Sequence, residues 1–165
     1  MEVSEVIDLI RKAKRSKVTA LNISIKGLNS LPPEISELKS LTKLDIRSSQ
    51  LTSLPPEISE LKNLTQLDLH NNQLTLLPPE ISELKNLTQL DLRNNQLTSL
   101  SPEILELGLD IKWEYQIGTK GVFLERNKLE SPPVEIIKQG REAVVNYFIS
   151  LEGEKRPLNE VKVLL

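Results

Sequence analysis

The chain has 165 residues and contains no cysteine. That absence excludes disulfides, thiolate metal sites and cysteine-based catalysis, and it favours a reducing compartment. The sequence holds a single histidine, His70, so a histidine-rich metal site and a Ser-His-Asp triad elsewhere in the chain are both excluded. The net charge of -2 provides no overall cationic field that would attract nucleic acid.

Long apolar runs are missing as well. The first stretch, MEVSEVIDLIRKAKR, mixes charged and apolar residues and has no uninterrupted apolar segment of the kind that signal peptides and membrane spans require. We therefore expect a soluble, cytoplasmic protein with no membrane insertion and no nucleic-acid partner.

What the chain does contain is an internal repeat. Units that open with LTKLDIRSSQ, LTQLDLHNNQ and LTQLDLRNNQ start at Leu41, Leu64 and Leu87, so the period is 23 residues, and a more divergent unit starts at Val18. Each unit carries the pattern L-x-x-L-x-L-x-x-N-x-L or a close variant, followed by an LPPEI-type segment. The first half of a unit has the period of a strand, and the two prolines in its second half exclude a strand and indicate a helical turn.

This pattern is the signature of leucine-rich repeats. It predicts an α/β fold over residues 18–131: a right-handed solenoid with a parallel β-sheet on its concave face. The N position of the pattern is held by Asn72, Asn95 and Asn127. We expect these residues to form a structural asparagine ladder in which each side chain bonds the backbone of its own turn and of the next. Earlier units carry other residues at this position, so the ladder should weaken toward the N-terminus.

A solenoid needs caps, because its terminal repeats would otherwise expose an apolar cross-section. Residues 1–17 are expected to form an N-terminal capping helix. Residues 132–152 are expected to form a C-terminal capping helix, which contains Gly140 as either a close backbone contact or a point of flexure.

The last repeat is irregular. Residues 109–125 interrupt the period, and their alternating apolar residues, separated by glycines, predict an inserted C-terminal hairpin. Trp113, Tyr115 and Phe123 lie in this insertion. They either seal the end of the solenoid or form a platform on which a ligand stacks.

Two columns of charged residues are expected on the concave face as candidate partner-binding residues. One column is Asp45, Asp68 and Asp91, and the other, two residues further along each strand, is Arg47, His70 and Arg93. The columns form either a self-compensating ladder, in which diagonal pairs offset the repulsion within each column, or a polar surface for a protein partner. A flat open array does not separate the roles of two carboxylates, so we expect neither catalytic residues nor metal ligands here.

The end of the chain narrows the family. The LPPEI repeats, the stretch NKLESPPVEIIKQGREAVVNYF, a short polar linker and the strand-like EVKVLL together resemble the repeat domain of bacterial Roco proteins. In that family the repeats lead through a helix into a Ras-like GTPase domain. Residues 153–165 are accordingly expected to be the linker and the start of that domain, and residues 160–165 should not pair with the repeat sheet.

The resemblance implies a protein-interaction and intramolecular regulatory domain of a small GTP-binding signalling protein. The chain lacks the phosphate-binding loop G-x-x-x-x-G-K-[ST]. No cofactor is therefore expected in this chain, no enzymatic activity either, and GTP and Mg²⁺ belong to the missing domain. The partner is expected to be a protein, either separate or another domain of the same parent. The alternative is a free-standing leucine-rich-repeat adaptor that binds a separate small GTPase.

Overall fold

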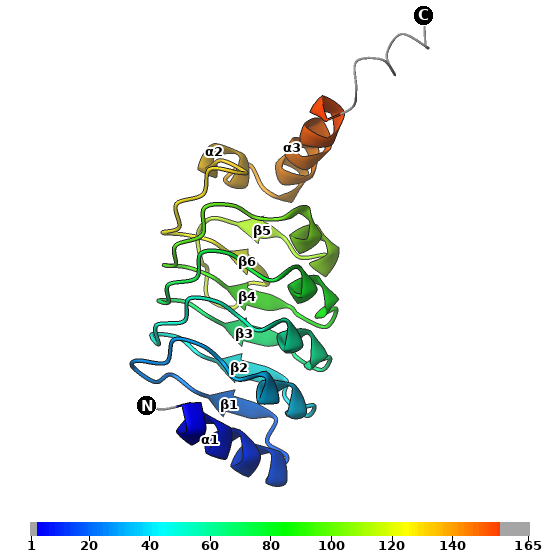
Figure 1. Ribbon diagram of the computed structural model, residues 1–165. Coiled ribbons are helices and arrows are strands. Elements are labelled where there is room, and N and C mark those ends of the chain that lie inside the picture. The colour runs from blue at the N-terminus through cyan, green and yellow to red at the C-terminus, as the bar shows by residue number, and fades with distance from the viewer. Residues whose placement is uncertain (1–2, 156–165) are drawn as a thin grey trace, which may run out of the picture.

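The computed structural model describes residues 3–155 of the protein, so the strand expected at residues 160–165 lies outside the described part. The chain winds as a stack of similar coils, with a short strand on one side of each coil and a 3-10 helix on the other (Figure 1). The first four coils contribute β1 (Ala20–Asn22), η1 (Pro33–Glu37), β2 (Lys43–Asp45), η2 (Pro56–Glu60), β3 (Gln66–Asp68), η3 (Pro79–Glu83), β4 (Gln89–Asp91) and η4 (Pro102–Leu107).

The leucine pattern explains the coil. In the third unit Leu64, Leu67 and Leu69 are at most 1% exposed and point into the core between the strands and the 3-10 helices. The first proline of the LPPEI segment is extended, with φ -70° and ψ 144° at Pro55, and the next proline begins η2. A proline lacks a backbone N–H and holds φ near the helical value, so this dipeptide ends the extended path and starts the 3-10 turn in the same place in each repeat.

All pairs in the six-stranded sheet are parallel, in the order β1-β2-β3-β4-β6-β5. The hairpin prediction for residues 109–125 is therefore wrong. β6 (Gly121–Phe123) inserts between β4 and β5 (Ile111–Lys112), and β5 becomes the edge strand. Alternating apolar residues predicted two strands correctly, but they carry no information about strand direction. β6 continues the register of the repeats by pairing with β4, and β5 pairs only with β6.

Helices close both ends of the stack. At the N-terminal end, α1 (Val3–Arg15) buries Val6, Ile10 and Ala13 against the first coil. At the C-terminal end the prediction of one helix over residues 132–152 is wrong, because α2 (Val134–Ile137) and α3 (Arg141–Glu154) are separate. Gly140 lies between them with φ +94°, a conformation that ends a helix and favours glycine.

Asparagine side chains tie successive coils together. Asn95 donates from Nδ2 to the carbonyls of Leu69 and Leu92 at 3.0 Å, and its Oδ1 accepts from the N–H of Leu74 at 3.0 Å. Asn72 and Asn127 make the same three kinds of bond. Each bonds its own turn and the preceding coil, whereas the sequence led us to expect the next one.

Candidate functional site

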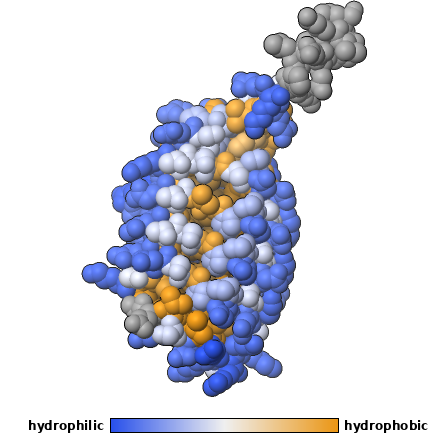
Figure 2. All heavy atoms as spheres, in the orientation of Figure 1, coloured by the Kyte–Doolittle hydropathy of each residue, from blue (hydrophilic) through white to orange (hydrophobic). Residues whose placement is uncertain are grey.

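The concave face is the side of the sheet that faces away from the 3-10 helices. Because the strands are in register, side chains at equivalent positions form columns: Lys43, Gln66 and Gln89 in one, and Asp45, Asp68 and Asp91 in the next. A hollow of about 390 Å³ lies over β1 to β4 and is lined by residues of both columns together with residues of β1. Hydrophilic side chains cover most of the face seen in Figure 2, and an apolar stripe runs along the stack between them.

The three aspartates have different surroundings, although the repeats that carry them are nearly identical. Asp91 is 2% exposed and binds Arg93 through both carboxylate oxygens, with Nη2–Oδ2 at 2.6 Å and Nε–Oδ1 at 2.9 Å. These hydrogen bonds raise the pKa of the Arg93 guanidinium above its usual value. The pair therefore has no net charge, and both oxygens of Asp91 are occupied.

Aromatic residues of the insertion cover this pair. Phe123 is the β6 neighbour of Asp91 in the sheet, and it is 0% exposed although its column faces outward. Tyr115 packs edge-on against Phe123, with ring centroids 4.9 Å apart, and the guanidinium of Arg93 lies 4.0 Å from the centre of the Tyr115 ring. The aromatic residues thus cover the C-terminal end of the concave face and leave the hollow over β1 to β4 open.

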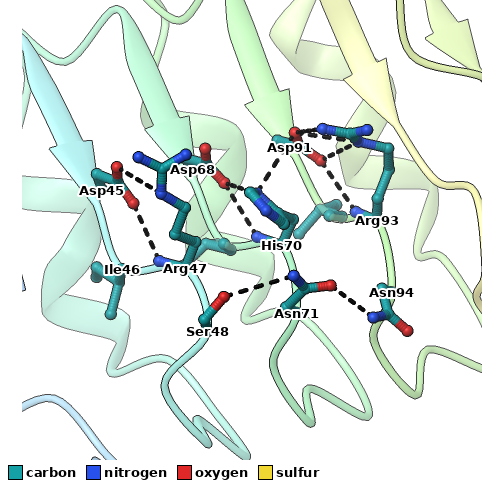
Figure 3. A network of polar contacts seen from close by, with 12 residues as sticks. Asp45, Ile46, Arg47, Ser48, Asp68, His70, Asn71, Asp91, Arg93 and Asn94 are labelled. Carbon is teal, nitrogen blue, oxygen red and sulfur yellow. Dashed lines mark hydrogen bonds and ion pairs between the residues drawn. The ribbon is translucent and has the colours of Figure 1, made fainter. Parts of the chain in front are cut away.

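Ion pairs on the concave face run along the strands (Figure 3). Arg47 binds Asp45 at 3.1 Å, and Nδ1 of His70 lies 2.6 Å from Oδ1 of Asp68. Diagonal pairing between strands, which the sequence led us to expect, is limited to a 3.9 Å approach of His70 to Asp91 among residues 3–155. The residue two positions after each aspartate has its side chain on the same face of the sheet. The aspartate also accepts the backbone N–H of that residue, so its carboxylate already points toward the side chain with which it pairs.

Asp68, His70 and Asp91 lie close enough together to be considered as metal ligands. Arg93 already occupies both oxygens of Asp91, and a metal ion would have to displace this guanidinium or share its ligand. The donor set that remains is one carboxylate and one imidazole. This arrangement does not fit a divalent cation, which takes at least four ligands in most protein sites.

Below the aspartate column, short polar side chains continue from coil to coil. Asn94 donates to Asn71, which donates to Ser48 at 3.4 Å (Figure 3). All three residues have positive φ, between 53° and 56°. Asparagine adopts this left-handed conformation more readily than most residues, so the row marks the bend at which each strand turns away from the sheet.

A further series of charged pairs, on another side of the stack, was missed in the sequence. Lysines pair with glutamates of the following coil on the side of the stack that carries the 3-10 helices, at 2.7 to 3.4 Å: Lys14–Glu37, Lys39–Glu60, Lys62–Glu83 and Lys85–Glu106. The four glutamates recur every 23 residues, as do the lysines from Lys39 onward, and this recurrence was the available signal. The hydrogen bonds from Lys14 and Lys39 lower the pKa of Glu37 and Glu60, respectively. These exposed pairs are structural and contribute little individually.

A further cleft, of about 500 Å³, separates the edge strand β5 from α2. Trp113 of the insertion lines it, together with Ile137 and Gly140 at the junction of α2 and α3. It lies at the end of the stack and is separate from the charged columns.

Known protein families and solved structures share the repeats of this fold. A family model for leucine-rich repeats in two copies matches residues 39–80 and again residues 62–106. These matches coincide with the coils whose leucines and asparagines are described above. The solenoid is a leucine-rich repeat domain. No curated protein matches the chain.

Solved structures with the same fold include a leucine-rich repeat protein of Leptospira interrogans, 37% identical, with a TM-score of 0.52 over 68% of this chain and 32% of that one. The leucine-rich repeat domain of the type III effector XopL is 25% identical, with a TM-score of 0.59 over 76% of this chain and 43% of that one.

The ectodomain of the plant receptor kinase GASSHO1/SCHENGEN3 of Arabidopsis thaliana was solved in complex with CASPARIAN STRIP INTEGRITY FACTOR 2. It is 27% identical, with a TM-score of 0.56 over 72% of this chain and 16% of that one. The leucine-rich repeat domain thus spans less than half the length of each of these three structures. Within residues 3–155, no helix has the length and hydrophobicity needed to span a membrane.

Proposed function

We propose that this leucine-rich repeat domain recognises a protein through its concave face, and that it does so as the regulatory domain of a Roco-type GTP-binding protein. The observation that carries protein recognition is the open hollow over β1 to β4, which polar side chains line and which the insertion leaves uncovered. Solenoids of this kind bind along the inner surface of their curve. The arrangement provides a rigid surface for recognition and no constellation suited to catalysis.

The link to a GTPase rests on the sequence. The stretch NKLESPPVEIIKQGREAVVNYF followed by a linker and EVKVLL is the part of the chain that resembles the Roco junction. In this proposal α3 and the residues after it transmit the position of the repeats to the GTPase domain, the partner is either that domain or a separate protein, and the protein is cytoplasmic.

The gene itself provides the first test. A G-x-x-x-x-G-K-[ST] loop encoded directly after Leu165 would support the Roco assignment. A stop codon there would instead favour the free-standing adaptor that binds a separate small GTPase.

The second test uses the intact parent protein. Removing residues 1–152 should change the rate of GTP hydrolysis, the nucleotide affinity or the dimerisation of the parent. Gln66→Trp fills the hollow and should reproduce that change, whereas Ser53→Trp, at an exposed position away from the strands, should leave all three properties as in the wild type. Unchanged behaviour of the truncated protein would exclude the regulatory role.

A further inference from the structure

The concave face carries an uneven distribution of charge from strand to strand. We define a row as the three outward side chains of one strand and the turn after it. The β2 row is Lys43, Asp45 and Arg47, with a formal charge of +1; the β3 row is Gln66, Asp68 and His70, with a charge of -1 when the imidazole is neutral; the β4 row is Gln89, Asp91 and Arg93, with a charge of 0. Two neighbouring rows therefore carry opposite charge.

Of the three aspartates in the column, Asp68 is the one that has no lysine or arginine partner. Arg47 and Arg93 are each bound to the aspartate of their own strand, at 3.1 and 2.6 Å. Oδ1 of Asp68 accepts the N–H of His70 at 3.1 Å and contacts its Nδ1 at 2.6 Å. Within residues 3–155 no lysine or arginine nitrogen lies within ion-pair distance of Asp68, whose side chain is 31% exposed.

The β2 row has the opposite imbalance. Asp45 is flanked on its own strand by two cations, Lys43 and Arg47, and binds one of them. Lys43 lines the same hollow as Asp68 and is exposed, so its ammonium is available to a partner.

The hollow joins these two features in one site. Lys43, Asp45, Gln66 and Asp68 all line it, and neighbouring strands lie about 4.8 Å apart. Its volume of about 390 Å³ suits one or two inserted side chains rather than a folded surface. The half-buried amides of Gln66 and Gln89 flank Asp68 and can bond the main chain of a bound segment.

We propose that the concave hollow binds a protein segment that carries neighbouring basic and acidic side chains, with the basic group at Asp68 and the acidic group at Lys43. This inference rests on the proposed function and adds the chemistry of the partner. Complementary charge selects partners and fixes their register, because juxtaposing like charges costs free energy while opposite charges pair. A segment placed one strand away would put its basic group over the β2 cations, so the register is set by the difference between the two rows.

The experiment selects random peptides, displayed on phage, on the immobilised protein, and then measures the affinity of the enriched peptides by fluorescence anisotropy. Enriched peptides should share a basic residue next to an acidic one. Asp68→Asn retains the acceptor oxygen for the N–H of His70, so it should fold normally by circular dichroism and weaken binding about tenfold. Lys43→Gln should weaken binding to a similar extent. Reversing the charge at both partners, with Asp68→Lys in the protein and the basic residue of the peptide changed to glutamate, should restore binding.

Comparing Gln66→Trp with the two charge variants separates this inference from the proposed function. Gln66→Trp should abolish binding of every enriched peptide. If it does so while Asp68→Asn and Lys43→Gln bind like the wild type, recognition by the concave face stands and the charge assignment is overturned. If the peptides bind the Gln66→Trp protein unchanged, or if selection enriches no peptide, both proposals are overturned. Equal competition by a free polyamine and by the enriched peptide would also overturn the assignment to a protein segment.

Discussion

At the scale of single residues, buried polar side chains hold the coils of the solenoid together. Asn95 is 3% exposed and satisfies three backbone groups that the turn removes from the sheet. In residues 3–155 no buried side-chain nitrogen or oxygen lacks a hydrogen-bond partner. Leaving a buried polar group without a partner costs more free energy than a hydrogen bond contributes. Each asparagine therefore stabilises the protein mainly because, without it, buried backbone groups would lose their hydrogen bonds.

Asn95→Ala should therefore lower the free energy of unfolding by about 3 kcal/mol, because three buried backbone groups lose their partner. The measurement is urea unfolding followed by circular dichroism. Asn63→Ala is the matched control: its side chain is exposed and donates one hydrogen bond, to the carbonyl of Lys39, so the expected loss is about 0.5–1 kcal/mol. Equal losses in the two variants would contradict this account of the ladder.

Arg93 and Arg47 occupy equivalent positions, yet they should differ in their effect on stability. Arg93→Ala leaves the carboxylate of Asp91, whose side chain is 3% exposed, without its cation, and should destabilise the protein by about 3 kcal/mol. Arg47→Ala removes a half-exposed pair and should cost about 0–1 kcal/mol. Thermal or urea unfolding of both variants checks the difference. An equal loss of stability in the two variants would contradict the view that Tyr115 shields the Asp91–Arg93 pair from water.

At the scale of elements, the insertion and the C-terminal helices depart from the sequence-based predictions for a common reason. Local patterns identify where a strand or helix forms, and both strands of the insertion were found in this way. Whether β5 and β6 run parallel depends on which neighbour each one pairs with, and β6 pairs with β4, whose sequence is distant. Similarly, the helical pattern continues across Gly140, and only its φ of +94° separates α2 from α3.

Two glycines of the C-terminal region should respond oppositely to alanine. Gly140→Ala should cost about 1–3 kcal/mol, since its φ of +94° strains a side chain although no atom lies within 4 Å of the added Cβ. Gly153→Ala, inside α3 with the same open surroundings, should stabilise the protein by up to about 1 kcal/mol through helix propensity. Thermal unfolding of the two variants provides the test, and a Gly140→Ala protein as stable as the wild type would contradict backbone strain at this position.

At the scale of the whole molecule, each coil contacts its neighbours and the caps close the ends. Stability in such a stack is a sum over coils and interfaces, so a local defect spreads mainly to the nearest coils. α1 lies against the first coil, while β4 is separated from it by two strands of the sheet.

Ile10→Ala, which truncates a fully buried side chain of α1, should cost about 2–5 kcal/mol at that interface. Hydrogen exchange followed by mass spectrometry should show a large loss of protection at β1 and little change at β4. A uniform loss over all strands would indicate that the domain unfolds as one unit and that the coils are not independent in this sense.

Sequence alone determined the repeat, the parallel strands of the first four coils, the capping of both ends by helices and the positions of the ladder asparagines. These features follow from short-range patterns that recur at a fixed period. Because successive repeats carry the same pattern, they bury the same positions and form the same hydrogen bonds. Tertiary structure decided the direction of β5 relative to β6, the break at Gly140 and the inequality of Asp45, Asp68 and Asp91. The last of these has a physical cause that no local pattern contains: Tyr115 and Phe123 come from a later part of the chain and exclude water from one carboxylate while leaving the others open.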